Sequence, residues 1–275
     1  MTKSIEKKVA LWLKKQGYPL EMEVASTAKS CGFDISQSDY YLDPEGGEAR
    51  EIDLVGSIRK NLSGFNMAYS LFVECKSSRD KPWLLFSTEN YLLNSSVASH
   101  RLTTSDSFIT NDLGYDLLLH SVSNRTIQNL YPRLDTEPTL AYGVTQAFTD
   151  HCEAPFKALM SSSKAALSHI NRFGSIGLGI PFIVAIPLVV IDVPMFSIIY
   201  SPSSHDLLIK EIKLGAFLWK HVVAGRSRIG IYIVHHLELE SFLMRCKNGA
   251  TWWTSIEENT LRQIHQERYG PKSLE

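Results

Sequence analysis

The sequence is poor in two features that would assign it quickly to a class of proteins. It has four cysteines among 275 residues and no CxxC pair, so neither a zinc site nor a disulfide framework is indicated. It also lacks an excess of charge, because 28 basic residues face 29 acidic ones. This balance excludes a protein that coats nucleic acid through net charge alone. We therefore expect a protein of the reducing cytoplasm that acts through a local site.

The sequence also lacks a hydrophobic run long enough for a clear transmembrane helix. The uncharged segment 176–191 (IGLGIPFIVAIPLVVI) is shorter than the ~20 residues that a helix needs to cross a bilayer. Pro181 and Pro187 interrupt it and many of its residues are β-branched, which favours a buried strand. The lysine-rich N-terminus has no apolar segment of a secretory signal. We expect no membrane association.

What is present is patterned like an α/β protein with a mixed central β-sheet flanked by helices, in a single domain over 1–273. Helices are expected at 4–16 and 19–32, both packed on one side of the sheet, and at 115–121, 144–172, 238–245 and 255–268. Strands are expected at 33–42, 49–58, 68–77, 182–191, 196–200, 205–214 and 228–235. The polar stretch 87–138 is expected to be an insertion, and 176–270 supplies the C-terminal strands and helices.

Two of these strands place acidic residues together. In the strand 49–58, an alternating pattern predicts Ile52 and Leu54 on one face and Glu51 and Asp53 on the other. This pattern predicts that one face of the strand is apolar and buried and that the other face carries the two acids.

The strand 68–77 supplies the partner. Alternation places Cys75 on the apolar face and Glu74 with Lys76 on the polar face. If Asp53 lies opposite Glu74, the midpoint of the hairpin falls at 63–64, inside a segment (NLSG) with turn chemistry. The turn therefore supports a hairpin that brings the two acids together.

Two facing carboxylates form a hard oxygen site. Mg²⁺ prefers carboxylates, water and substrate phosphate as ligands, and we expect Mn²⁺ to be able to substitute. A metal at Asp53 and Glu74 would activate water and polarise a phosphate, while the ammonium of Lys76 would stabilise developing negative charge. This combination predicts phosphodiester hydrolysis.

The motifs EID at 51–53 and ECK at 74–76 resemble the PD-(D/E)xK, or restriction-endonuclease-like, nuclease superfamily. The resemblance covers a core of about 19–83, and Ile52 stands where the name of the family has proline. It implies a restriction-endonuclease-like core and a Mg²⁺-dependent endodeoxyribonuclease, a hydrolase that cuts DNA.

The resemblance also assigns roles to individual residues. Asp53, Glu74 and the backbone carbonyl of Cys75 would bind the metal, and Lys76 would assist the attacking water. Glu23, on the helix ahead of the first strand, would tune the site. Further candidates are Glu21 and Glu6 for the helical acid, Glu51 as an additional acid, and Gln146, expected early in a long helix, as a phosphate contact.

A second arrangement of the same residue types competes with this one. Glu211 and Lys213 form another E-x-K motif, and Asp192 ends the apolar segment upstream. The midpoint of Asp192 and Glu211 falls in a turn at 201–202. We favour the first hairpin because a helix with an acid precedes it, and the second remains the alternative site.

The expected partner is DNA. A nuclease domain with almost no net charge needs targeting from a homo-oligomer, a separate partner protein or a local basic groove, which would suit restriction, phage defence or repair. The alternative function, from another class, is a catalytically inactive nuclease-fold scaffold or regulatory interaction module.

Overall fold

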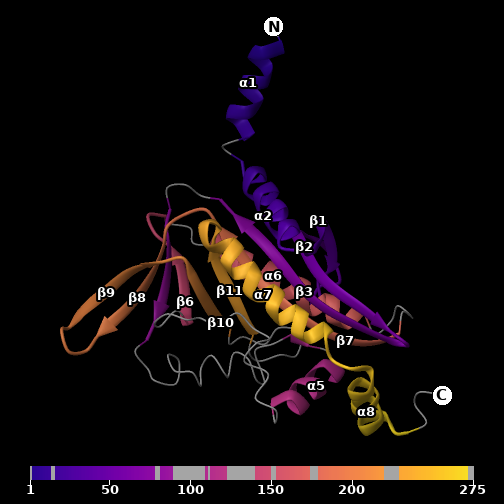
Figure 1. The fold of residues 1–275 in the computed structure, drawn as a ribbon. Coiled ribbons are helices and arrows are strands. Elements are labelled where there is room, and N and C mark those ends of the chain that lie inside the picture. Colours follow the sequence, from indigo (N-terminus) through magenta and orange to yellow (C-terminus); the bar gives the residue numbers. More distant parts are fainter. Residues whose placement is uncertain are drawn as a thin grey trace.

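The residues described in the computed structural model form an eleven-stranded mixed β-sheet with helices on both faces (Figure 1). The structure describes residues 2–13, 16–77, 81–88, 109–110, 112–122, 140–149, 153–173, 179–219 and 229–271.

The helices are α1 (Thr2–Leu13), α2 (Tyr18–Ser30), α5 (Asp112–Val122), α6 (Glu153–Phe173), the 3-10 helix η2 (His236–Glu238), α7 (Leu239–Thr254) and α8 (Glu258–Tyr269). The strands are β1 (Asp34–Leu42), β2 (Ala49–Leu62), β3 (Phe65–Lys76), β4 (Trp83–Ser87), β5 (Ile109–Thr110), β6 (Leu140–Gln146), β7 (Ile180–Ile191), β8 (Met195–Ser201), β9 (Asp206–Ile212), β10 (Leu214–Trp219) and β11 (Ile229–His235).

The sheet is built from an antiparallel meander joined to parallel strands. Strands β1, β2 and β3 pair antiparallel, and β7 then pairs parallel to β3 on one side and to β11 on the other. The short strand β5 also pairs with β7. The full order is β1-β2-β3-β7-β11-β10-β6-β4-β8-β9. The α/β class and the mixed sheet flanked by helices agree with the sequence prediction.

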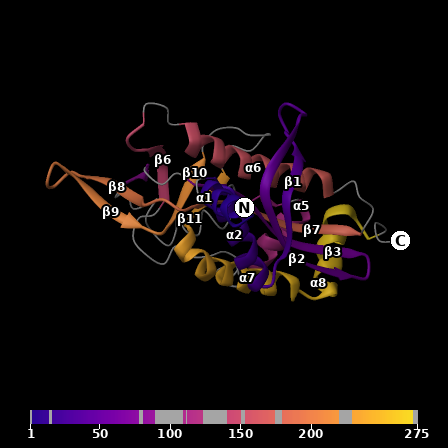
Figure 2. The same cartoon turned by 90° about the horizontal axis from the view of Figure 1, so that it is seen from above.

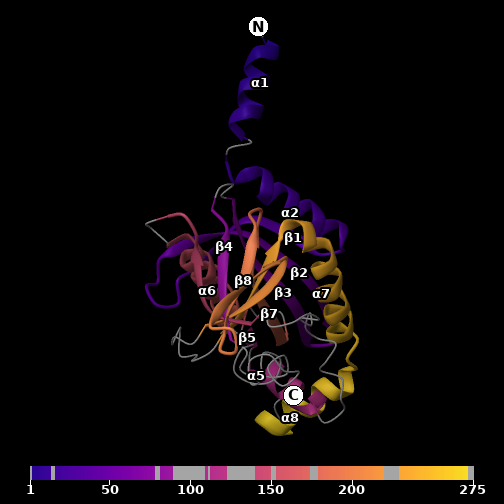
Figure 3. The same ribbon diagram turned by 90° about the vertical axis from the view of Figure 1, so that its left-hand side faces the viewer.

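Two hydrophobic cores lie on opposite faces of this sheet. One core packs α2, α5, α7 and α8 against the first face, and the other packs α6 against the second face. Figure 3 shows the sheet between α6 and α7. Because β3 and β7 have helices on both sides, their alternate side chains contribute to both cores.

Strand β7 confirms that the apolar segment is a buried strand as far as it is described, from 179 onward. Its side chains from Phe182 to Ile191 are buried. Pro187 lies between the part of β7 that pairs with β5 and the part that pairs with β11, so a residue without an amide hydrogen is tolerated there. Within the described residues, no helix is long and apolar enough to span a membrane.

The helix α1 differs from the expectation that both N-terminal helices pack on the sheet. It extends away from the body (Figures 1 and 3), and Ile5, Val9 and Trp12 on its apolar face are exposed. In contrast, α2 buries Leu20 and Val24 against the sheet as predicted. The amphipathic pattern of α1 therefore predicts its helical structure correctly but not its packing.

Two further expectations were wrong at element boundaries. The expected helix 144–172 begins only at Glu153, because the segment before it forms β6. The expected strand 205–214 is divided between β9 and β10, and Leu214 begins the second of them. The short strand β4 was not expected at all. Of the expected insertion 87–138, residues 89–108, 111 and 123–138 lie outside the described residues, and the expected helix 115–121 lies within α5.

Candidate active site

The hairpin formed by β2 and β3 carries the two predicted acids. Its paired residues run from Leu54, opposite Val73, to the turn at 63–64, where the glycine has a φ of 86° that glycine adopts without strain. This confirms the register that the sequence predicted. Asp53 and Glu74 are the next residue on each strand, so they lie at the same end of the hairpin.

The strand β2 does not keep its alternation at Asp53. Ile52 packs on the α6 face and Leu54 on the α2–α7 face, so the prediction that these two share a face is wrong. Ser38 of β1, which faces Asp53, has a left-handed φ of 48°, and the pairing of β1 with β2 skips both residues. The regular alternation of side chains is interrupted at Asp53. Its Oδ2 accepts a hydrogen bond from the amide of Cys75 at 2.7 Å.

The strand β3 keeps the alternation that the sequence predicted. Leu71, Val73 and Cys75 belong to the α2–α7 core. Burial raises the pKa of the Cys75 thiol well above its usual range, and the nearby Asp53 carboxylate raises it further, so the thiol stays protonated. The predicted role of Cys75 uses only its backbone carbonyl, which is compatible with a buried side chain.

Glu74 faces the opposite core, beneath α6. Its carboxylate forms an ion pair with Lys76, two residues further along the same strand. Ser161 of α6 also hydrogen-bonds to Glu74, and the same hydroxyl interacts with the buried Tyr41. Glu74 is therefore held from two sides, by its own strand and by the helix above it.

The buried environment makes both carboxylates easier to protonate. Burial raises the pKa of Glu74, and the nearby Asp53 adds to the effect, while Lys76 opposes it. Burial also raises the pKa of Asp53, against the opposing effects of the Cys75 amide and of Lys76. For Lys76, burial alone would lower the pKa, but the adjacent Glu74 outweighs it and raises the pKa. Two acids and one ammonium thus share one poorly hydrated site.

The helix α2 contributes an acid to this site, and that acid is Glu21. Burial raises the pKa of Glu21, Asp53 and Glu51 raise it further, and Lys76 opposes the rise. Glu23 contacts a different group at this end of the sheet, since its Oε1 is 3.1 Å from Nδ1 of His236, the residue after β11. Two residues on a helix differ by about 200° in direction, so Glu21 and Glu23 cannot face the same site. The alternative Glu6 lies on the exposed helix α1.

The competing hairpin does not form in the predicted register. Strands β8 and β9 pair with Phe196 opposite Glu211, so Glu211 does not face Asp192 across the hairpin. Asp192 directly follows β7 and accepts a hydrogen bond from the hydroxyl of Ser77 at 2.6 Å. Asp192 therefore lies beside the end of β3, next to Lys76, and extends the first site instead of forming a second one.

Gln146 lies away from this site. It ends β6, and its Nε2 donates a hydrogen bond to the carbonyl of Lys81 at 3.2 Å. Three strands, β7, β11 and β10, separate β6 from β3 in the sheet. The expectation that Gln146 begins a long helix was wrong, and the structure does not bring it near the acids.

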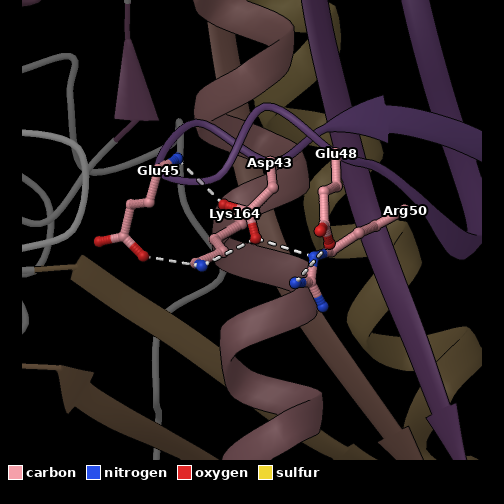
Figure 4. Close-up of polar contacts among 5 residues, drawn as sticks. All are labelled: Asp43, Glu45, Glu48, Arg50 and Lys164. Atoms are coloured by element: carbon pink, nitrogen blue, oxygen red, sulfur yellow. Dashed lines mark hydrogen bonds and ion pairs between the residues drawn. The ribbon is translucent and has the colours of Figure 1, made fainter.

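An ion-pair cluster fixes α6 above the site (Figure 4). Asp43, in the turn between β1 and β2, is buried, and its Oδ2 lies 2.8 Å from Nε of Arg50 and 3.0 Å from Nζ of Lys164 on α6. The ammonium of Lys164 also contacts Glu45 at 2.7 Å. Lys164 is three residues after Ser161, almost one helical turn, so this anchor helps to fix the hydroxyl that contacts Glu74.

A cavity of about 420 Å³ lies on the same face of the sheet, between the strands and α6. Tyr41, Phe72 and His169 are among the residues that line it. None of Asp53, Glu74 and Lys76 lines this cavity. The acids therefore lie at the end of the β2–β3 hairpin beside the cavity and not within it.

The donor atoms of the site fit a hard divalent cation with few protein ligands. Within the described part of the chain, no three His, Cys, Asp or Glu residues are grouped so that they could hold a metal by themselves. Mg²⁺ does not need such a group, because it commonly uses one or two carboxylates together with water and substrate phosphate. The carboxylates of Asp53 and Glu74, with the carbonyl of Cys75, match this preference and offer no soft ligand.

The sequence analysis did not identify Ser161, on α6 above Glu74, or Ser77 and His236, at the carboxyl end of the parallel strands. Ser77 and His236 directly follow the parallel strands β3 and β11. The carboxyl ends of parallel strands gather at one edge of a sheet, so this signal was present once the pairing was known. Comparison of the chain with protein-family models, with curated proteins and with solved structures finds no match.

Proposed function

We propose that this protein is a Mg²⁺-dependent nuclease that hydrolyses phosphodiester bonds of DNA, built on a restriction-endonuclease-like core. The observation that carries the proposal is the arrangement of Asp53, Glu74 and Lys76 at one end of the β2–β3 hairpin. Burial raises the pKa of both carboxyls, so their charges oppose folding. Such groups are commonly found at functional sites.

Each side chain has a distinct role in this proposal. Asp53, Glu74 and the Cys75 carbonyl would hold the metal, which would supply a polarised phosphate and an activated water. Lys76 would orient the attacking water and balance negative charge, because its ammonium lies beside Glu74. Glu21 would adjust the charge of the site from α2, the place for which the sequence suggested Glu23.

One observation favours the second candidate function, an inactive nuclease-fold scaffold or regulatory module. The ion pair between Lys76 and Glu74 already neutralises both groups within the chain. A protein that has lost catalytic activity could keep the ion pair between Lys76 and Glu74 for stability. The two functions differ in one respect, because only the nuclease needs Lys76 to leave Glu74 for a substrate.

The test is an incubation of the purified protein with plasmid, linear duplex and single-stranded DNA, and with RNA, in Mg²⁺ or in EDTA. We expect cleavage of DNA that needs Mg²⁺ and is lost in Asp53→Asn. The matched control is Glu153→Gln, an exposed acid on α6 that pairs with Lys157 and should cleave like the wild type. No cleavage of any substrate, with a correctly folded wild type, would favour the scaffold. Cleavage of RNA alone would reassign the substrate.

A further inference from the structure

The strand β9 forms an exposed apolar edge of the sheet. It is the last strand in the pairing order and pairs only with β8 among the described residues. The β8–β9 hairpin projects from the body in Figures 1 and 2. Leu207, Leu208 and Ile209 are 53%, 50% and 63% exposed, although neighbouring residues on a strand point to opposite faces. Both faces of this edge therefore present large apolar side chains to solvent.

Exposed edges of this kind are a hazard, because their free amides and carbonyls pair with other chains. Charged side chains on the strand usually prevent such pairing by repulsion. The charged residues of β9 are Asp206, Lys210 and Glu211. Asp206 and Lys210 do not have this effect against a second β9, and Glu211 lies outside the segment 206–210 that would pair. In an antiparallel pair centred on Leu208, each Asp206 lies opposite a Lys210, and the two-fold symmetry repeats the attraction.

The apolar residues follow the same symmetry. About the same centre, Leu207 of each strand lies opposite Ile209 of the other, and the two Leu208 side chains meet on the axis. Opposed residues on paired strands point to the same face, so Leu208 joins the Asp206 and Lys210 pairs on one face. Leu207 and Ile209 form an apolar patch on the other face. This register therefore matches charge with opposite charge and apolar with apolar at every position from 206 to 210.

We propose that β9 pairs antiparallel with β9 of a second copy of this chain, about a two-fold axis at Leu208. The pairing would join the two sheets edge to edge and cover the exposed apolar residues of both. Oδ1 of Asp206 now accepts a hydrogen bond from the amide of Leu207 at 2.7 Å. In the dimer it would turn to Lys210 of the second copy. The proposal is independent of the nuclease activity, since six strands separate β9 from β3 in the sheet.

Charge reversal tests both the edge and the register. Asp206→Lys places two lysines opposite each other, and Lys210→Asp places two aspartates opposite each other, in both cases twice per dimer. Each variant alone should weaken the dimer by roughly tenfold or more, because two attractions become two repulsions. An equimolar mixture of the two variants should dimerise again, since every lysine then faces an aspartate. The double variant Asp206→Lys/Lys210→Asp should also dimerise.

The measurement is sedimentation equilibrium of the full chain, whose mass of 31.0 kDa should double in the dimer. Lys157→Asp, an exposed charge reversal on α6, is the matched control and should dimerise like the wild type. Circular dichroism of each variant checks that it is folded. A monomeric wild type at its highest soluble concentration would overturn the proposal. Single variants that stay dimeric, or a mixture that stays monomeric, would overturn the proposed edge and register.

Discussion

The carboxylate of Asp53 accepts the amide hydrogen of Cys75 at 2.7 Å, where a backbone carbonyl of β2 would continue the ladder. A side chain thus replaces the main chain at the end of the hairpin. This relationship fixes the carboxylate of Asp53 at the end of the hairpin, in a buried environment that raises its pKa.

Asp53→Asn should separate the charge of this residue from its hydrogen bond. The amide oxygen of asparagine can still accept from Cys75, but it lacks the charge that holds a hard divalent cation against its hydration shell. We expect cleavage to fall by roughly a hundredfold or more, and Mn²⁺ binding by calorimetric titration to be lost. Glu74→Gln should behave in the same way.

The control for this prediction is Glu211→Gln, on the β8–β9 hairpin outside the site, which should keep Mn²⁺ binding. If Glu211→Gln or Asp192→Asn loses Mn²⁺ binding while Asp53→Asn and Glu74→Gln bind normally, the metal is held near β7 and β9 and the proposed site is wrong.

Lys76→Ala and Cys75→Ala should have opposite effects on neighbouring positions. Lys76 lies at the acids, so its loss should abolish cleavage while the protein stays folded. Cys75 packs in the α2–α7 core, and its truncation should cost about 1 kcal/mol of unfolding free energy with cleavage retained. Urea unfolding and DNA cleavage, measured on both variants, test the assignment. The reverse result would mean that the faces of β3 are exchanged.

The pH dependence of metal-free stability should reveal the buried charge of Asp53. Its pKa is higher in the folded protein than the ordinary value of 3.8, because burial disfavours the charged form. Below that ordinary value the carboxyl is protonated in both states, so its charge does not affect stability. As the pH rises through the higher folded pKa, the buried charge forms and stability is lost.

Asp53→Asn should therefore be more stable than the wild type above this range, and the difference in Tm should shrink as the pH falls through it. Thermal unfolding in EDTA from acid to neutral pH measures this difference. A wild type that is more stable than Asp53→Asn at neutral pH would show that the carboxylate stabilises the fold. Metal affinity should fall over the same range, because protons compete for the ligands.

Glu21→Gln and Glu23→Gln form a matched pair on one helix. Glu21 interacts electrostatically with Asp53, whereas Glu23 contacts His236. We expect Glu21→Gln to change the rate of cleavage and its pH profile, and Glu23→Gln to leave both unchanged. Equal effects of the two substitutions would indicate that α2 acts only through its packing.

Lys164→Met should loosen the anchor of α6. The substitution leaves Arg50 as the remaining cation beside the buried Asp43. We expect the free energy of unfolding to fall by about 1–3 kcal/mol at neutral pH. Burial would raise the pKa of Asp43, but the amide of Glu45 and the ammonium of Lys164 outweigh it and lower the pKa. The contribution of the pair is therefore present above the ordinary pKa of 3.8 and is lost as the pH falls through the lowered one.

Urea unfolding at neutral and acid pH tests this contribution. Lys157→Met, whose ion pair with Glu153 is exposed, should have little effect. An equal loss in both variants at neutral pH would show that the Asp43 cluster does not anchor the helix.

The sequence was sufficient for features that depend on local chain geometry. The register of β2 and β3 follows from the position of one turn, and β7 follows from its continuous apolar composition. The face of Asp53 could not be predicted, because the break in alternation depends on Ser38 in the neighbouring strand. Likewise, both Glu21 and Glu23 precede the first strand, and only the position of α2 on the sheet separates them.

Features that join distant segments were beyond the sequence pattern. Ser161 approaches Glu74 because α6 crosses β3, and Asp192 approaches Ser77 because β7 pairs with β3. Gln146 was assigned to a helix because its segment runs into an amphipathic pattern. Its pairing with Trp83 of β4, and the pairing of Leu140 and Ala141 with β10, make the segment a strand instead. In each case tertiary contacts outweighed the local preference.

The parallel pairing of β3 with β7 has a consequence for how the chain folds. Ser77 and Asp192, at the end of this pairing, are 115 positions apart in the chain, whereas the β2–β3 hairpin closes through a two-residue turn. Local contacts form fast and distant ones slowly, because closing a long loop costs more entropy. The hairpin should therefore bring its two acids together early, and the docking of β7 should limit the rate at which the buried sheet is completed.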